Sequence, residues 1–206
     1  MPPADSASRA GGMTKASGDP SSRTFGIRIM LQAEAQSSAR LSFEKITPFH
    51  ASKLTSALCD SQVYEFIDMA CPTLTELETF FGRLEAGAPT DRADESWFDY
   101  AVRRDGDGQF IGRVEATVIG PNAEVAYLFG SEFWGQGYAH ESLSWLHSIL
   151  SKHLGATDIW ASINPANQRS IRFIQRFGYR EAPQNTWPRL TSYDSGDRVF
   201  RYKQGE

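Results

Sequence analysis

The sequence predicts one α/β domain in which a central mixed sheet is flanked by helices. Segments that alternate apolar and polar residues, as strands do, recur between segments with the apolar spacing of helices. The Asp-Gly pairs of Asp105 to Gly108 are strong signals for a hairpin between two of the strands. A glycine-rich turn, Trp134 to Ala139, separates another strand from an amphipathic helix.

A strand and two helices are expected first. Residues 41–46 alternate apolar and polar side chains, as a half-buried strand does, and residues 48–58 have a helical pattern. Thr73 and Glu76 have the spacing of a capping box, which predicts that a helix begins there. The apolar side of that helix carries Leu74, Leu77, Phe80, Phe81 and Leu84.

The remaining segments complete the sheet. Strands are expected at 97–103 and 110–118, which form the hairpin, and at 125–129, 158–163, 179–181 and 198–202. Helices are expected at 137–152 and 167–177. Gly178 stands where a helix often ends in a left-handed residue, so it marks the end of the last helix.

Residues 1–38 differ in composition from the rest of the chain. They are rich in Ser, Ala, Gly and Pro, a composition that cannot bury enough apolar surface to fold. We therefore expect a disordered N-terminal tail at 1–38 and a folded domain at 39–206. No apolar core follows the basic residues of the tail, so a secretory signal is not expected.

Composition narrows the classes of protein. A chain of 206 residues with 40% hydrophobic residues can build one sizeable domain. The net charge of −4 gives no general attraction to nucleic acid or to anionic membranes, and no apolar run approaches the roughly 20 residues that span a bilayer. Cys59 and Cys71 are too few for a disulfide framework or a metal site. We expect a cytoplasmic protein without a metal, either a monomer or a homodimer.

The glycine-rich turn indicates an anion-binding site. Gly135 and Gly137 lack Cβ atoms, so the backbone can turn sharply there and approach a ligand closely. The helix that follows directs free N–H groups and the positive end of its dipole at the turn, which favours a phosphate or pyrophosphate. Neither a P-loop nor a complete dinucleotide fingerprint is present. A turn of this kind alone would equally well be a simple connection.

A second motif, downstream of the turn, indicates which kind of anion-binding protein this is. Trp134-Gly-Gln-Gly-Tyr-Ala139 is followed by Asn167, Ser170 and then Gly178-Tyr179, in order and at suitable spacing. In these residues the chain resembles the GNAT superfamily of acetyl-CoA-dependent N-acetyltransferases, and most closely the branch with Rim-type and aminoglycoside acetyltransferases. The resemblance covers about residues 40–202. It implies a mostly antiparallel sheet in which one pair of neighbouring strands splays apart.

The resemblance also implies the cofactor site. Acetyl-CoA would lie with its pyrophosphate on the turn and its pantetheine arm along the splayed strand edge, where a backbone N–H near Leu128 or Phe129 polarises the thioester. Asn167 matches the position that contacts the arm, and it is equally suited to cap its helix. Packing is the preferred role for the side chains of Trp134 and Tyr138. The implied cofactor-binding residues are Leu128, Phe129, Trp134, Gly135, Gln136, Gly137, Tyr138, Ala139, Asn167 and Ser170.

The implied reaction is direct attack of a primary amine on the thioester. Ser170 matches the position that hydrogen-bonds the leaving thiolate; a surface helix serine is its alternative role. Glu124 is the first candidate for the base and Glu115 the second, and either is also suited to a salt bridge. Water is the third candidate for the base. Glu141, in the first turn of the cofactor helix, is expected to be structural.

The acceptor amine is the least determined part of the prediction. The segments 60–68, 89–97 and 187–196 would surround it, and the acidic and aromatic residues in and beside them are Tyr64, Glu65, Asp68, Asp91, Asp94, Glu95, Trp97 and Asp99. These suit a cationic acceptor, although a solvated acidic loop has the same composition. A protein or peptide N-terminal α-amine is the leading acceptor. The alternatives are a small amine, such as an aminoglycoside or polyamine, and a domain that binds acyl-CoA or a partner without turnover.

Overall fold

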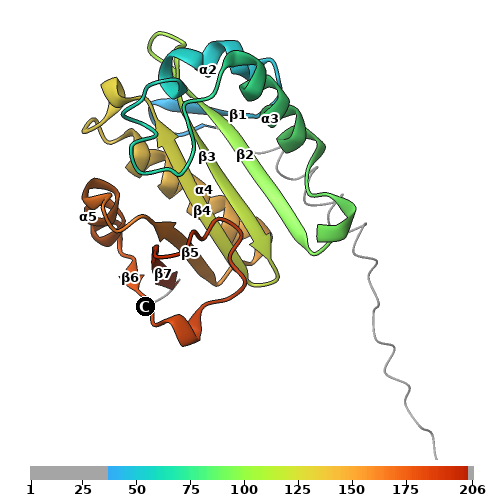
Figure 1. Cartoon of the computed structure of the whole chain (residues 1–206), viewed down its shortest axis with the longest axis vertical. Helices are drawn as coiled ribbons and strands as arrows, with labels where there is room; N and C mark the ends of the chain where they lie inside the picture. Colours follow the sequence, from blue (N-terminus) through green and yellow to red (C-terminus); the bar gives the residue numbers. More distant parts are fainter. Residues whose placement is uncertain (1–36, 204–206) are drawn as a thin grey trace, which may run out of the picture.

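The computed structural model describes residues 37–203, which form a seven-stranded sheet flanked by helices (Figure 1). The strands are β1 (Leu41–Lys45), β2 (Glu95–Arg104), β3 (Phe110–Ile119), β4 (Asn122–Phe129), β5 (Asp158–Ile163), β6 (Arg180–Glu181) and β7 (Arg198–Lys203). The helices are α2 (His50–Leu58), α3 (Leu74–Ala86), α4 (Tyr138–Leu154) and α5 (Gln168–Phe177). Short 3-10 turns lie at Thr90–Arg92, Ser131–Phe133 and Gln184–Thr186.

The sheet is mixed and mostly antiparallel, as the sequence predicts. Its strand order is β1-β2-β3-β4-β5-β7-β6, and β4 and β5 are parallel neighbours. Their pairing covers three positions and ends where Glu124 lies beside Trp160. Beyond this point β4 continues to Phe129 and β5 to Ile163 without pairing to each other. The expected splayed pair of strands is therefore confirmed.

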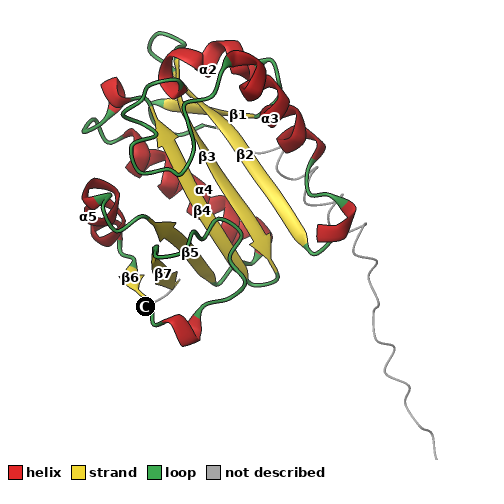
Figure 2. Cartoon of the chain, in the orientation of Figure 1, coloured by secondary structure: helices red, strands yellow, loops and turns green. Residues whose placement is uncertain are grey.

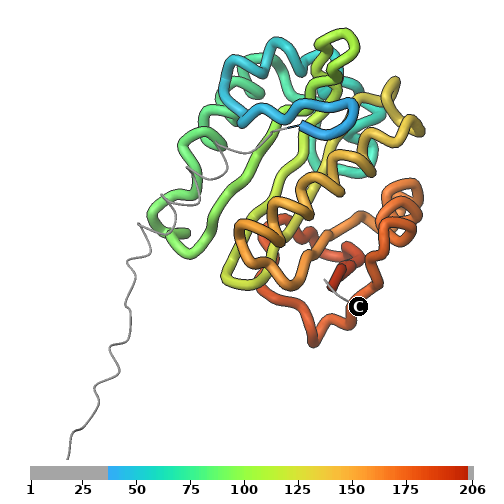
Figure 3. The backbone as a smooth tube through the Cα atoms, turned by 180° about the vertical axis from the view of Figure 1, so that it is seen from behind, coloured from blue at the N-terminus to red at the C-terminus, as the bar shows by residue number. Residues whose placement is uncertain are grey.

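The two faces of the sheet carry different helices (Figure 2). α4 and α5 pack on one face, and α4 is seen lying across the sheet from behind (Figure 3). α2 and α3 pack on the other face, where Leu128 of β4 joins their apolar cluster. Because side chains alternate along a strand, Glu124 and Ala126 share this second face with Leu128. We call it the acceptor face.

Local signals set the ends of the helices. The predicted capping box of α3 is present: the Thr73 hydroxyl accepts from the Glu76 N–H at 3.3 Å, and the Glu76 carboxylate accepts from the Thr73 N–H at 2.8 Å. Gly155 and Gly178 end α4 and α5 in the left-handed region, with φ angles of 63° and 119°.

Several boundaries differ by a few residues from those predicted. β4 begins at Asn122 rather than at residue 125, because it pairs with β3 up to the tight turn at Gly120. α2 begins at His50 rather than at Pro48, since the His50 N–H closes a turn onto the Thr47 carbonyl at 3.0 Å. The tail predicted at 1–38 lies outside the described residues, apart from its last two. Among the helices of residues 37–203, none has the length and hydropathy that spanning a bilayer requires.

Candidate active site

The turn between β4 and α4 has a backbone suited to close approach by an anion. Gly135 and Gly137 have φ angles of 74° and 83°, in the left-handed region that glycine adopts without strain. Gly137 is the N-cap of α4 and has no side chain to cap the helix, so the N–H groups of Tyr138, Ala139 and His140 have no acceptor within it. These donors and the helix dipole fit a phosphate or pyrophosphate.

Arg40 and Glu141 hold this turn against the start of β1. The Glu141 carboxylate accepts from the Arg40 N–H at 2.8 Å, from Arg40 Nε at 2.7 Å and from the Ser38 hydroxyl at 2.7 Å. Arg40 Nη1 donates to the Gln136 carbonyl at 3.2 Å. Burial raises the pKa of Glu141, but the hydrogen bonds from Ser38 and Arg40 outweigh it and hold the pKa below its ordinary value. Through these contacts Glu141 has a structural role, joining the turn to the start of β1.

The side chains of the loop make contacts with the protein itself. Trp134 Nε1 donates to the Phe129 carbonyl at 2.8 Å, and the Arg169 guanidinium stacks 3.3 Å from the centre of the Trp134 ring. Gln136 Nε2 donates at 2.7 Å to the backbone of the preceding 3-10 turn. The Tyr138 ring is buried in the core. The loop therefore offers a ligand its backbone N–H groups rather than these side chains.

The free edge of β4 lies beside this turn. The N–H of Gly130 donates to the Ile111 carbonyl on β3 at 3.1 Å. Because successive residues of a strand direct their backbone groups to opposite sides, the N–H of Phe129 faces the gap between β4 and β5. By the same alternation the N–H of Leu128 faces β3. Of the two expected oxyanion donors, Phe129 has the suitable orientation.

Asn167 and Ser170 meet at the start of α5, as their spacing predicts. Asn167 Oδ1 accepts from the Ser170 N–H at 3.0 Å and caps the helix. Ser170 Oγ lies 2.6 Å from the hydroxyl of Tyr127 on β4. Burial raises the pKa of Tyr127, so this hydroxyl stays protonated at neutral pH. Two hydroxyls share one hydrogen bond, which leaves one proton that can be donated to a third atom.

Glu124 lies on the acceptor face beneath the loop that joins β6 to β7. Glu124 as a residue is 7% exposed, and its carboxylate accepts from the Ser162 hydroxyl at 3.1 Å. It also accepts from the N–H and hydroxyl of Thr191, at 2.5 and 3.0 Å, and of Ser192, at 3.3 and 2.7 Å. A carboxylate has about four lone-pair positions, so these five donors occupy its accepting capacity.

A second pair of carboxylates lies in the middle of the acceptor face. Asp99 on β2 is opposite Glu115 on β3, and Glu115 is opposite Ala126 on β4. Arg113 forms an ion pair with Glu115 and lies 3.9 Å from Asp99. Burial and the negative charge of Glu115 raise the pKa of Asp99 to about 7. At neutral pH this carboxyl can therefore both accept and release a proton.

Three residues that contribute to this site, Tyr127, Thr191 and Ser192, were missed by the sequence reasoning. Tyr127 neighbours Leu128 in a strand, so period-two alternation would have directed its ring towards α5. Thr191 and Ser192 carry no such signal, because they lie in a loop without periodicity and contact Glu124 across 67 and 68 residues of sequence. Asp99 was named only as part of an acidic region.

Solved structures share this fold at low sequence identity. An acetyltransferase of the GNAT family from Bacillus anthracis superposes with a TM-score of 0.66 at 18% identity, over 82% of this chain and 98% of its own. A Vibrio cholerae protein provisionally described as a ribosomal-protein-serine acetyltransferase gives 0.65 at 20%, over 83% and 98%. The aminoglycoside acetyltransferase AAC(6')-Ib with coenzyme A gives 0.60 at 20%, over 80% and 95%.

The sequence itself matches a family model. The model of the acetyltransferase (GNAT) domain aligns with residues 40–180, which include the glycine-rich turn, the splayed strands and α5. These are the elements that the sequence analysis expects to bind the cofactor. The chain belongs to the GNAT family and is an acetyl-CoA-dependent N-acetyltransferase.

Proposed function

We propose that this enzyme acetylates the N-terminal α-amine of a protein or peptide. The observation that carries the proposal is the Asp99–Glu115 pair, in the middle of the acceptor face and in register with Ala126 of β4. Negative charge there attracts a cationic amine. The pKa of Asp99, raised to about 7 by burial and by Glu115, is close to the value of about 7.7–8.0 for an α-ammonium. The shift brings the two pKa values closer together and so favours transfer of a proton from the ammonium to Asp99.

Acetyl-CoA would occupy the gap between β4 and β5, where it supplies an activated acetyl thioester. The N–H groups from Gly135 to Ala139 would hold its pyrophosphate. The unpaired edge of β4 would hydrogen-bond the pantetheine amides as a neighbouring strand does. Of the expected residues, Phe129, the backbone of the turn from Trp134 to Ala139, Asn167 and Ser170 fit this placement, whereas the N–H of Leu128 faces β3 and does not.

Three groups of this chain would carry the chemistry. The Phe129 N–H stabilises the negative charge that develops on the thioester oxygen. Ser170, held by Tyr127, donates a hydrogen bond to the leaving thiolate. Asp99, paired with Glu115, accepts the proton of the amine. Positioning of the two reactants accounts for much of the acceleration, because no covalent acyl-enzyme is needed.

A small amine is the second candidate for the acceptor. Structures of AAC(6')-Ib, which share the fold, contain ribostamycin or kanamycin. The acidic residues of the acceptor face suit a polycation as well as a single ammonium. An alkylamine with a pKa of about 10.4, however, holds its proton more firmly than an α-ammonium does, so the Asp99 carboxyl would remove that proton less readily.

Two measurements test the proposal. Titration calorimetry with acetyl-CoA and with free CoA should show saturable binding of both; no binding to folded protein would remove the cofactor placement. Release of free thiol should then follow addition of a peptide that begins with serine, and no release should follow addition of the same peptide with a blocked N-terminus. Turnover of kanamycin without turnover of the peptide would show that the acceptor is a small amine and not an N-terminal α-amine.

A further inference from the structure

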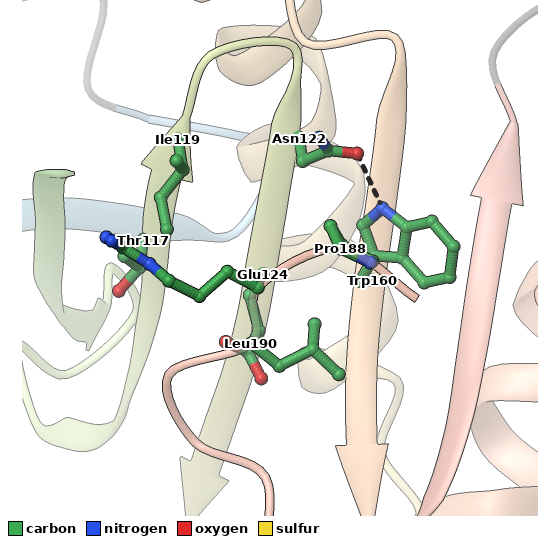
Figure 4. Close-up of a pocket in the computed structure, with 8 residues that line it drawn as sticks. Thr117, Ile119, Asn122, Glu124, Trp160, Pro188 and Leu190 are labelled. Carbon is green, nitrogen blue, oxygen red and sulfur yellow. Dashed lines mark hydrogen bonds between the residues drawn. The ribbon is translucent and has the colours of Figure 1, made fainter. Parts of the chain in front are cut away.

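A segment of the loop between β6 and β7 crosses the acceptor face. We call this segment, residues 187–192, the strap. Pro188 and Leu190 lie over the strands that carry Thr117, Glu124 and Trp160 (Figure 4). The cavity left between the strap and these strands is about 10 Å³, room for no more than one water molecule. The strap therefore closes this end of the face.

Two buried carboxylates hold the strap against the sheet. At its centre, Arg189 donates to Glu95 at 2.8 Å, and the side chain of Glu95 is 3% exposed. At its end, Thr191 and Ser192 supply four of the five donors that Glu124 accepts. A buried charge is stable only with such partners, so Glu124 depends on the donors of the strap. The N–H and hydroxyl groups of Thr191 and Ser192 in turn find their acceptor in Glu124.

The strap borders the position assigned to the acceptor amine. Glu124 and Ala126 are two residues apart on β4, about 7 Å by strand geometry, and Ala126 is in register with Glu115. The anchored end of the strap thus lies beside the Asp99–Glu115 pair, on the same face. From these contacts we propose that Glu124 is a positioning residue, which fixes the strap as one wall of the acceptor site and so determines which acceptors fit.

This role differs from the expected role of Glu124 as the base. A base needs a lone pair directed at the amine or at a water molecule, whereas five fixed donors surround the Glu124 carboxylate. The inference rests on the proposed function for the identity of the acceptor. The anchoring of the strap does not depend on it.

The anchoring can be measured without any assay of activity. Trypsin cleaves after arginine, and the Arg189 side chain is 54% exposed. A protease must also draw the residues on both sides of the bond into its own cleft, so we expect the cut after Arg189 to require that the strap leave the sheet. Glu124→Gln should increase the rate of this cut, followed by mass spectrometry, by about tenfold or more. The amide carries no negative charge, and its NH2 group in place of Oε1 cannot accept from the Ser162 and Ser192 hydroxyls. Thr191→Val with Ser192→Ala, which removes two hydroxyl donors and leaves Glu124 intact, should increase the rate in the same direction.

Kinetics distinguish a positioning residue from a base. With the serine peptide as acceptor, both variants should raise KM for the peptide, leave the affinity for acetyl-CoA unchanged and keep the shape of the pH–rate profile. The matched control is Glu181→Gln, which breaks the exposed ion pair with Arg198 on β7 and should change none of these quantities.

Three results would overturn the proposal. The first is a strap that stays protected from trypsin in Glu124→Gln. The second is a fall in kcat for Glu124→Gln with loss of the acidic limb of its pH profile, which would make Glu124 the base. The third is an unchanged KM for the peptide when the strap is released. If the wild type turns over no acceptor, the proposed function fails, and the trypsin rates alone decide the anchoring.

Discussion

The hydroxyl of Tyr127 on β4 lies 2.6 Å from the hydroxyl of Ser170 in the first turn of α5. The contact spans 43 residues of sequence and joins the strand that faces the cofactor gap to the helix that Asn167 caps. A serine hydroxyl alone is a weak acid. In this pair one hydroxyl donates to the other and polarises it, so the second hydroxyl is a better donor to a third atom.

Ser170→Ala should lower kcat by about a hundredfold, the lower end of what one donor to a developing charge contributes. The affinity for acetyl-CoA should stay the same, because the mutation removes a contact that strengthens only as the thiolate forms. Ser144→Ala is the matched control, since Ser144 is an exposed helix serine that bonds the carbonyl of His140. Steady-state kinetics and calorimetry check both values; an unaltered rate would make Ser170 structural.

Tyr127→Phe should lower kcat less than Ser170→Ala does. The ring would keep its edge contact with Phe173, at a centre distance of 5.1 Å, and lose only the hydroxyl. Because the two hydroxyls act together, the double variant should be no slower than Ser170→Ala alone. Additive effects in the double-mutant cycle would contradict the coupling.

Gly137→Glu should abolish binding of acetyl-CoA. The change forces a side chain into a backbone with a φ of 83° and places a negative charge where the pyrophosphate would lie. Gly155→Glu, at the other end of α4 with a φ of 63°, carries the same strain of about 1–2 kcal/mol and should keep the cofactor affinity. Calorimetry measures the affinity of the two variants for acetyl-CoA. Equal affinities would show that the cofactor does not bind at this turn.

Asp99→Asn should remove the acidic limb of the pH–rate profile. Burial and Glu115 raise the pKa of Asp99 to about 7, and only the ionised form accepts a proton. Wild-type kcat/KM should therefore be full above this pKa and fall as the pH drops through it. The variant should be slow and nearly independent of pH over the same range. Asp105→Asn, on the exposed β2–β3 turn, is the control, and persistence of the limb in Asp99→Asn would exclude this base.

His147 should make the fold less stable in acid. Burial lowers its pKa to about 4 from an ordinary value of 6.5, while Nε2 lies 2.7 Å from the Tyr179 hydroxyl. The folded state keeps this histidine neutral, but the unfolded chain takes up a proton near 6.5. Stability is therefore full above 6.5 and is lost as the pH falls towards 4, by about 3 kcal/mol. Urea unfolding of the wild type and of His147→Gln measures the difference; equal pH slopes would contradict it.

The parts of this protein that repeat or alternate were predictable from the sequence. Period-two alternation identified β1, and the Asp-Gly pairs identified the hairpin of β2 and β3. Thr73 and Glu76 located the start of α3, because a capping box acts within one helical turn. The left-handed backbone of the glycine-rich turn was predictable for the same reason, because Gly135 and Gly137 act locally on the chain.

The acceptor side was less predictable, because its contacts join residues that are far apart in sequence. Glu124 is a strand carboxylate by sequence, and only the fold brings Thr191 and Ser192 onto it. Asp99 resembles any acidic residue of a polar segment until β3 places Glu115 opposite it. Whether a carboxylate acts as a base or as an anchor is decided by these neighbours, which no local pattern contains.

The short pairing of β4 and β5 links the stability of the enzyme, and so its abundance in the cell, to the concentration of acetyl-CoA. Beyond Glu124 and Trp160 the two strands leave backbone groups unpaired with each other within the described sheet, and open strand edges invite pairing with other chains. In the proposed placement a bound donor would cover this edge, and at 100 times its Kd it would add about 2.7 kcal/mol to the stability of the fold. A cell poor in acetyl-CoA would then lose enzyme molecules to aggregation and proteolysis as well as turnover. The abundance of the catalyst would follow the supply of the metabolite that it consumes.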